Sequence, residues 1–149
     1  MKRIQTLVAC LVLTGAGLAA LAAMPLAAQA ATVETRMTER GTILVNEAGF
    51  TLYMFTSDKK HRDHCVTVEK CTTFWPPLTT MGMPTVGMGL KSKWVSTIML
   101  PGGEKQVTFK KKPLYTYIGD SMPGQTSYIG AFAFGGYWYG LSAKGKPIK

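Results

Sequence analysis

The pattern Leu-Tyr-x-aromatic-x-x-Asp occurs twice in this chain, at residues 52–58 and at residues 114–120. Alternate side chains of a β-strand point to the same face, so the two aromatic rings of each copy share one face. These pairs of rings are Tyr53 with Phe55 and Tyr115 with Tyr117. A chain with two such aromatic faces must cover both of them, and this requirement constrains its fold more than any other feature.

An aspartate, Asp58 or Asp120, follows each of the predicted aromatic strands. A short carboxylate in this place accepts backbone N–H groups of a turn. We therefore interpret both aspartates as turn caps, and Tyr53 and Tyr115 as packed rings whose hydroxyl groups form hydrogen bonds. The alternative is a polar cluster, in which all four side chains converge across a symmetry axis and bind a ligand.

The repetition extends beyond these two segments. Trp75 and Leu78 recur 63 positions later as Trp138 and Leu141, whereas Tyr115 follows Tyr53 by 62 positions. One inserted residue therefore aligns two copies of a unit that contains a β-branched strand, an aromatic strand, a polar loop and a Trp-x-x-Leu segment. A duplicated unit of this kind cannot bury its hydrophobic face alone, so we expect the two copies to pack on each other.

This duplication predicts a single all-β domain at residues 31–149. We expect two tandem hairpin-based repeats, packed with pseudo-two-fold symmetry into one small sheet or barrel-like domain. The expected boundaries are about 41–80 for repeat one, about 81–92 for the linker and about 93–145 for repeat two.

Local patterns predict the strands within each repeat. A β-branched run at 42–45, turn residues at 46–49 and an aromatic run at 50–55 are typical of a β-hairpin. Residues 31–40 are polar and lack a period, so we expect a loose arm there. Residues 79–90 are rich in Gly, Met and Pro, which favours a long loop.

The first thirty residues are typical of a signal peptide. Lys2 and Arg3 precede an apolar run at 7–23, and the small residues at 28–30 form a cleavage site after Ala30. An uncleaved membrane anchor is the alternative, because the run approaches the length of a membrane span. Cys10 lies too close to Arg3 to be a lipid-modified cysteine. We expect an exported chain, periplasmic or extracellular, with no membrane span after cleavage.

The exported part of the chain is basic. It holds fifteen of the seventeen Lys and Arg residues and all eight Asp and Glu residues, which leaves a net charge of about +7. A solvated basic surface that aids solubility is the simplest interpretation. The alternative is contact with anionic envelope components, either lipid headgroups or cell-wall polymers. Export makes nucleic acid an improbable partner, and whether the chain is a monomer or an oligomer does not follow from its sequence.

Two cysteines, Cys65 and Cys71, follow the signal peptide. In an oxidising compartment an even pair this close is most simply a disulfide. Reduced thiols would permit a different site, because His61 and His64 stand beside them in a spacing that suits four-coordinate zinc. We favour the disulfide, with two solvated histidines in the same loop.

Methionines add a second candidate metal site. Met81, Met83 and Met88 lie in one predicted loop, and thioethers are soft ligands that select Cu(I). Together with His61 and His64 they make a periplasmic copper-binding or electron-transfer accessory protein the alternative function. Methionines are also ordinary fillers over a hydrophobic core, and we favour that interpretation.

These motifs together resemble those of the secreted repeat lipoproteins and their relatives, exported bacterial proteins that carry a Tyr-x4-Asp motif in tandem. The resemblance covers residues 40–145. It rests on both copies of the opening pattern, on Cys71-x-x-x-Trp75-Pro76-Pro77-Leu78, and on Gly135-Gly136-x-Trp138. Lys112 stands where the family often has Gly, and the lipid-modified cysteine of many members has no counterpart here. The resemblance implies export and a tandem fold, but it implies no reaction, because the family has no known function.

Enzymatic chemistry finds little support in the sequence. The chain contains no nucleophile elbow and no phosphate-cradling glycine loop. A glycosidase pair of carboxylates would have to be Asp58 and Asp120, or glutamates that are scattered over the expected surface. We therefore expect a non-catalytic binding or structural module of the envelope, with a cell-wall hydrolase as the least favoured function.

Overall fold

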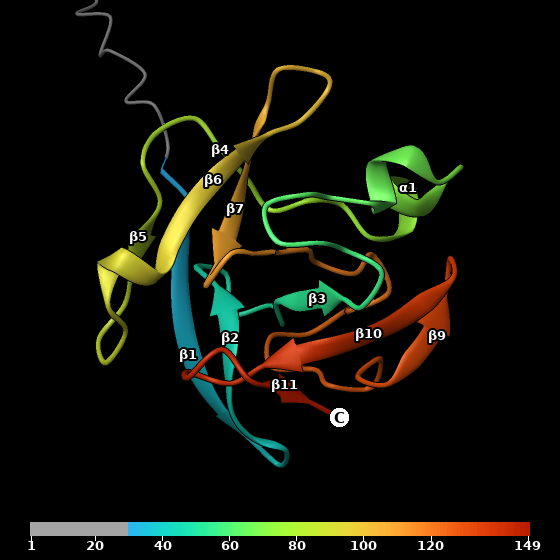
Figure 1. The fold of residues 1–149 in the computed structure, drawn as a ribbon. Coiled ribbons are helices and arrows are strands. Elements are labelled where there is room, and N and C mark those ends of the chain that lie inside the picture. The colour runs from blue at the N-terminus through green and yellow to red at the C-terminus, as the bar shows by residue number, and fades with distance from the viewer. Residues whose placement is uncertain (1–29) are drawn as a thin grey trace, which may run out of the picture.

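Short β-strands joined by tight turns make up most of residues 30–149, the part of the chain that the computed structural model describes (Figure 1). The predicted signal peptide, residues 1–30, lies outside this part except for its last residue. In chain order the strands are β1 (Thr32–Thr38), β2 (Gly41–Asn46), β3 (Tyr53–Phe55), β4 (Thr79–Thr80), β5 (Thr85–Val86), β6 (Val95–Met99), β7 (Lys105–Phe109), β8 (Lys112–Pro113), β9 (Ala131–Ala133), β10 (Gly136–Leu141) and β11 (Pro147–Ile148).

Three small sheets contain these strands. Their orders are β2-β1-β5, then β11-β10-β3 with β9 also paired to β10, and β4-β7-β6 with β8 also paired to β7. The all-β prediction is therefore confirmed. The three sheets remain open, and residues 30–149 form no closed barrel, so the barrel-like form of that prediction is wrong.

Strand β1 corrects the expectation of a loose arm at residues 31–40. It pairs antiparallel with β2 along its length, from Val33 opposite Asn46 to Thr38 opposite Gly41. The side chain of Val33 is fully buried and contributes to the core. One buried valine among threonines and charged residues gives too weak an alternation to predict a strand, although threonine itself favours extended backbone.

The hairpin predicted at 42–55 has the expected turn, but only its residues next to the turn pair with each other. Gly49 has φ of +82° and donates its N–H to the carbonyl of Asn46, as a turn at 46–49 requires. Val45 forms a bridge with Thr51 across this turn. Strand β3, however, pairs with β10 from the other end of the chain. The loop predicted at 79–90 contains two very short strands, β4 and β5.

Three short helical segments interrupt the strands, and two of them hold the disulfide. They are η1 (Cys65–Thr67), α1 (Cys71–Phe74) and η2 (Ser92–Trp94). Cys65 and Cys71 are bonded to each other with 5.3 Å between their Cα atoms, which confirms the predicted disulfide. Both cysteines are fully buried against the aromatic core. None of the helices within residues 30–149 is long and apolar enough to cross a membrane.

The two repeats are intertwined, because each one completes the strand pairing of the other. Tyr53 of repeat one pairs with Gly140 of repeat two, and Tyr115 of repeat two pairs with Pro77 of repeat one. In the alignment of the repeats Tyr53 corresponds to Tyr115 and Pro77 corresponds to Gly140, so the two pairings are equivalent. The Trp-x-x-Leu segment of each repeat therefore lies against the aromatic strand of the other, as Figure 1 shows for β10 beside β3.

Two hydrophobic clusters fill the interior, and both draw on the two repeats. The first, which we call the aliphatic cluster, is mainly aliphatic and contains Val33, Leu44, Leu52, Val95, Val107, Phe109, Leu114 and Leu141. The second is mainly aromatic and contains Tyr53, Phe55, Cys65, Cys71, Trp75, Tyr115, Ile129 and Trp138. The shared interior is what the duplication predicted.

Candidate functional site

Tyr53 and Tyr115 lie side by side on the axis that relates the two repeats. The N–H of Tyr53 donates to the carbonyl of Tyr115 at 2.8 Å, and the N–H of Tyr115 donates to the carbonyl of Tyr53 at 3.0 Å. Both side chains are completely buried. The key residues of the two motifs thus occupy equivalent environments at the centre of the domain.

Each tyrosine forms a hydrogen bond with the aspartate of the other repeat. The Tyr53 hydroxyl donates to Asp120 Oδ2 at 3.0 Å, and the Tyr115 hydroxyl donates to Asp58 Oδ2 at 2.9 Å. Asp58 also accepts the N–H of His64 at 2.7 Å through Oδ1, so it caps its own loop as predicted. At Asp58 the structure therefore unites turn capping with a hydrogen bond across the axis, which were predicted as alternatives. Asp120 accepts no backbone N–H within residues 30–149, so the prediction that it caps its turn is wrong.

Burial determines the acidity of these carboxyl groups. It raises the pKa of Asp58 from 3.8 to about 7, against the opposing effect of the hydrogen bonds from His64 and Tyr115. It raises the pKa of Asp120 to about 6, against the hydrogen bond from Tyr53. Burial likewise raises the pKa of both tyrosines. Tyr53, Tyr115 and Asp120 are buried, so the arrangement connects the repeats inside the domain, whereas Asp58 is half-buried at the surface.

Asp63 is a third buried carboxyl group beside Tyr115, and the sequence analysis did not single it out. Its Oδ1 accepts the N–H of Val66 at 2.9 Å, and burial raises its pKa. Its Oδ2 and the Oδ1 of Asp120 have no hydrogen-bond partner among residues 30–149. Two carboxyl groups next to one buried tyrosine disfavour simultaneous ionisation, because like charges at low dielectric repel.

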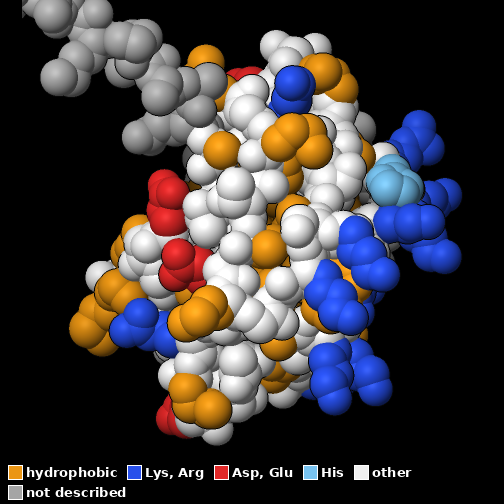
Figure 2. All heavy atoms as spheres, turned by 90° about the vertical axis from the view of Figure 1, so that its left-hand side faces the viewer, with side chains coloured by type: hydrophobic (Ala, Val, Ile, Leu, Met, Phe, Trp, Pro, Cys, Tyr) orange, Lys and Arg blue, Asp and Glu red, His pale blue; other side chains and the backbone are white. Residues whose placement is uncertain are grey.

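Positively charged side chains gather on one part of the surface. We call it the basic face, and its residues are Lys59, Lys60, Arg62, Lys91, Lys93, Lys110, Lys111 and Lys112. Figure 2 shows Lys and Arg side chains gathered along one edge of the molecule around a histidine, with the acidic side chains toward the opposite edge. The residues come from three stretches that are far apart in the chain.

Two adjoining clefts hollow the basic face. The larger, which we call the Trp94 cleft, has a volume of about 500 Å³ and is lined by His61, Lys93, Trp94, Ser96, Lys110 and Lys111. The smaller has a volume of about 170 Å³ and is lined mainly by Lys59, Lys60, Lys110, Lys111, Lys112 and Asp58. Lys110 and Lys111 line both clefts, so they form the ridge between them. The sequence showed the Lys110–Lys112 run but gave no sign of its neighbours.

Both halves of the chain match one protein-family model, described as a secreted repeat of unknown function, at residues 34–79 and 96–141. These two matches together cover more than half of the chain. The chain belongs to this secreted repeat family. No curated protein and no solved structure matches it. The first match of this secreted repeat protein begins within β1 and the second begins within β6.

The disulfide of the secreted repeat protein removes the zinc alternative. Both thiols are bonded to each other, so neither Cys65 nor Cys71 can serve as a thiolate ligand. Among residues 30–149 there is no cluster of three or more His, Cys, Asp or Glu side chains that could hold a metal ion.

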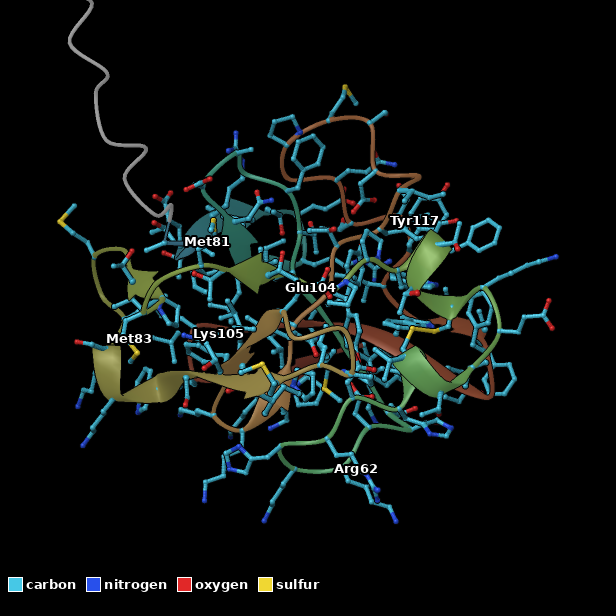
Figure 3. The ribbon with its side chains drawn as sticks, turned by 90° about the horizontal axis from the view of Figure 1, so that it is seen from above. Arg62, Met81, Met83, Glu104, Lys105 and Tyr117 are labelled. Atoms are coloured by element: carbon cyan, nitrogen blue, oxygen red, sulfur yellow. A yellow bond between two sulfur atoms is a disulfide. The ribbon has the colours of Figure 1, made fainter. Side chains whose placement is uncertain are left out.

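The copper candidates of the secreted repeat protein do not come together. His61 lies at the Trp94 cleft, whereas His64 stacks on Phe55 with 6.4 Å between ring centroids. Met81 lines a different cleft, beside Glu104 and Lys105. Figure 3 places Met81 and Met83 well apart from Arg62, the neighbour of His61. The side chains of Met81, Met83 and Met88 are all strongly exposed, so they are not fillers over the core as we had favoured.

Proposed function

We propose that this protein is an exported, non-catalytic binding module whose basic face binds an anionic polymer of the cell envelope. The single observation that carries the proposal is the meeting of six lysine side chains from both repeats, Lys59, Lys60, Lys93, Lys110, Lys111 and Lys112, around two adjoining clefts. Summed charge of one sign over a concave surface attracts polyanions and concentrates them locally.

The cations are arranged for contact with a ligand in solvent. Lys59, Lys60 and Arg62 are exposed in one loop, and Lys91 and Lys93 are exposed in another. The nearest carboxyl group, Asp58, is held by Tyr115 and by the backbone of His64. Its raised pKa also reduces its negative charge at neutral pH. The face therefore keeps most of its positive potential.

A polymer fits this face better than a membrane surface does. Proteins that bind a bilayer surface combine cations with apolar side chains that enter the lipid. The large hydrophobic side chains exposed within residues 30–149, such as Met88 and Phe132, line neither cleft. A hollowed, charged surface is suited to a flexible chain of anionic units.

A non-catalytic role agrees with the position of the motif residues. The carboxyl groups that a hydrolase would need, Asp58 and Asp120, accept hydrogen bonds from buried tyrosines between the repeats. The separation of the histidines from Met81 and Met83 likewise favours binding of an anion over binding of copper.

Binding of the mature protein to long-chain inorganic polyphosphate, measured by calorimetry, tests the proposal. Replacing Lys59, Lys60, Lys110 and Lys111 by Gln should weaken binding at least tenfold, and added salt should weaken binding of the unchanged protein. The matched control loses the same charge elsewhere, through replacement of Arg40, Lys70, Lys105 and Lys149 by Gln. Equal losses in both variants would overturn the proposal, and so would tighter binding to phosphatidylglycerol vesicles than to the polymer.

A further inference from the structure

We propose that the Trp94 cleft is a subsite for one phosphoryl group together with the sugar or polyol that carries it. The inference rests on the proposed function, because the cleft is part of the basic face. It goes further by naming the chemical group that is recognised and the residues that recognise it.

An ammonium group is held in place at this cleft by neutral partners. Lys110 Nζ lies 4.0 Å from the centroid of the Trp94 ring and donates a hydrogen bond to the carbonyl oxygen of Lys144 at 2.7 Å. Lys91 Nζ lies 5.7 Å from the same ring. Cation–π contact and a carbonyl position a charge without neutralising it. The cleft therefore presents a preorganised cation whose charge remains available to an anion.

The core fixes the aromatic part of this arrangement. Trp94 is half-buried, and its ring meets Phe109 edge-on with 5.8 Å between centroids. Phe109 is completely buried in the aliphatic cluster. A ring anchored in this way holds the Lys110 ammonium at a constant position, as a binding site requires.

Three residues that line the cleft, His61, Lys110 and Lys111, have positive φ, a backbone conformation that residues with a side chain rarely adopt. Lys110 and Lys111 form the two-residue connection between β7 and β8, with φ of +48° and +70°. Such a connection favours Asn-Gly, because a side chain at positive φ is sterically disfavoured. His61 has φ of +58° and donates its N–H to the carbonyl of Lys111 at 3.0 Å. Strained residues of this kind cluster at functional sites, and these three all line one cleft.

The chemistry of the cations favours a phosphoryl group over a carboxylate. Three lysines line the Trp94 cleft: Lys93, Lys110 and Lys111. A phosphoryl group carries a charge of about −1.5 to −2 and three acceptor oxygens, so it matches several point-charge ammonium groups better than a carboxylate does, which carries a single negative charge. Ser96 adds a hydroxyl group. At about 500 Å³ the cleft also has room for the carbon skeleton that bears the phosphoryl group.

Titration of the mature protein with glycerol 3-phosphate, followed by NMR of the indole N–H groups, tests the subsite. The Trp94 signal should move in a saturable way, while the buried Trp75 and Trp138 act as internal references. Glycerol and glycerate should move it at least tenfold less at equal concentration. An unmoved Trp94 signal, or an equal response to glycerate, would overturn the assignment.

A variant that improves the turn separates binding from folding. Lys110→Asn with Lys111→Gly should raise the thermal midpoint, since it relieves positive φ at two side chains, and should weaken glycerol 3-phosphate binding at least tenfold. The control is Lys105→Asn with Lys70→Gly, which removes the same charge away from the cleft. Unchanged affinity in the turn variant would show that the strained lysines serve no ligand.

The outcomes distinguish this inference from the function on which it rests. Polyphosphate binding without a response of Trp94 would refute the subsite and leave the proposed function standing. Glycerol 3-phosphate binding at Trp94 without polymer binding would refute the proposed function and leave the subsite standing. A Trp94 response to phosphatidylglycerol vesicles that exceeds the response to polyphosphate would identify a lipid headgroup as the source of the phosphoryl group and contradict the polymer.

Discussion

Trp75 and Trp138, which occupy equivalent positions in the two repeats, stack face to face with 4.0 Å between ring centroids and 3° between ring planes. Phe55 also stacks on Trp138 at 4.3 Å, and Tyr117 packs on Trp75 at 4.2 Å. Rings from repeat one and repeat two therefore alternate along the stack. Neither repeat contains enough of the stack to form it alone, so the two repeats should fold as one cooperative unit.

Truncation of either central tryptophan should destabilise the whole domain. We expect Trp75→Ala and Trp138→Ala each to lower the free energy of unfolding by about 3–5 kcal/mol, since each leaves a large cavity in a shared core. Urea unfolding followed by circular dichroism measures the change. Phe132→Ala is the control, because Phe132 is 65% exposed and should change stability by less than about 0.5 kcal/mol. A two-step unfolding curve in either tryptophan variant would contradict the single cooperative unit.

Removal of a motif hydroxyl group should be costly even though the ring remains. Tyr53→Phe and Tyr115→Phe each leave a buried carboxyl group without its donor, which should cost about 1–3 kcal/mol. Tyr137→Phe, at an exposed position, is the matched control. In a double-mutant cycle, Tyr115→Phe should couple with Asp58→Asn and should be additive with Asp120→Asn. Coupling of Tyr115→Phe with Asp120→Asn instead would contradict the hydrogen bond between each tyrosine and the aspartate of the other repeat.

Stability should rise as the pH falls from neutral toward 4. Burial raises the pKa of Asp58 to about 7 and that of Asp120 to about 6, above the ordinary value of 3.8. Between these values the folded state binds protons that the unfolded chain has released, so the stabilisation is complete below about pH 4 and is lost as the pH rises toward 7. Urea midpoints at pH 5 and pH 7.5 should differ by about 1–3 kcal/mol in unfolding free energy.

Asp58→Asn with Asp120→Asn should weaken this dependence, because neither amide titrates, and the remaining part comes from Asp63, whose pKa burial also raises. The measurement is the same urea midpoint at the same two pH values. A midpoint of the unchanged protein that falls on acidification between pH 7.5 and pH 5 would contradict the raised pKa values.

Loss of the disulfide should weaken the domain modestly. Cys65 and Cys71 close a loop with a sequence separation of six, for which the chain-entropy account gives about 2 kcal/mol. Cys65→Ser with Cys71→Ser should therefore lower the urea midpoint while leaving the fold intact. Thiol titration of the exported protein should detect no free thiol, and two reactive thiols per chain would disprove the bond in the native protein.

Local features of the sequence determined much of this fold. The alternation of Tyr53 with Phe55 places both rings on one face, and the spacing of Trp75 and Trp138 reveals the duplication. The disulfide was also predictable, since two close cysteines in an exported chain have few other partners. Each of these inferences depends only on residues that are near one another or identical between the repeats.

Only the tertiary structure decided which residues meet across the repeats. The sequence assigned Asp58 to the turn after Tyr53, but Asp58 accepts the hydroxyl hydrogen of Tyr115, because the repeats exchange their Trp-x-x-Leu segments. The same holds for the basic face, where Lys59, Lys93 and Lys111 converge from three distant stretches. Strand period and turn chemistry act over a few residues, whereas the pairing of distant strands is selected by the burial of the whole interior at once. For this reason many of the strands could be predicted from the chain, whereas β1 and the candidate binding site could not.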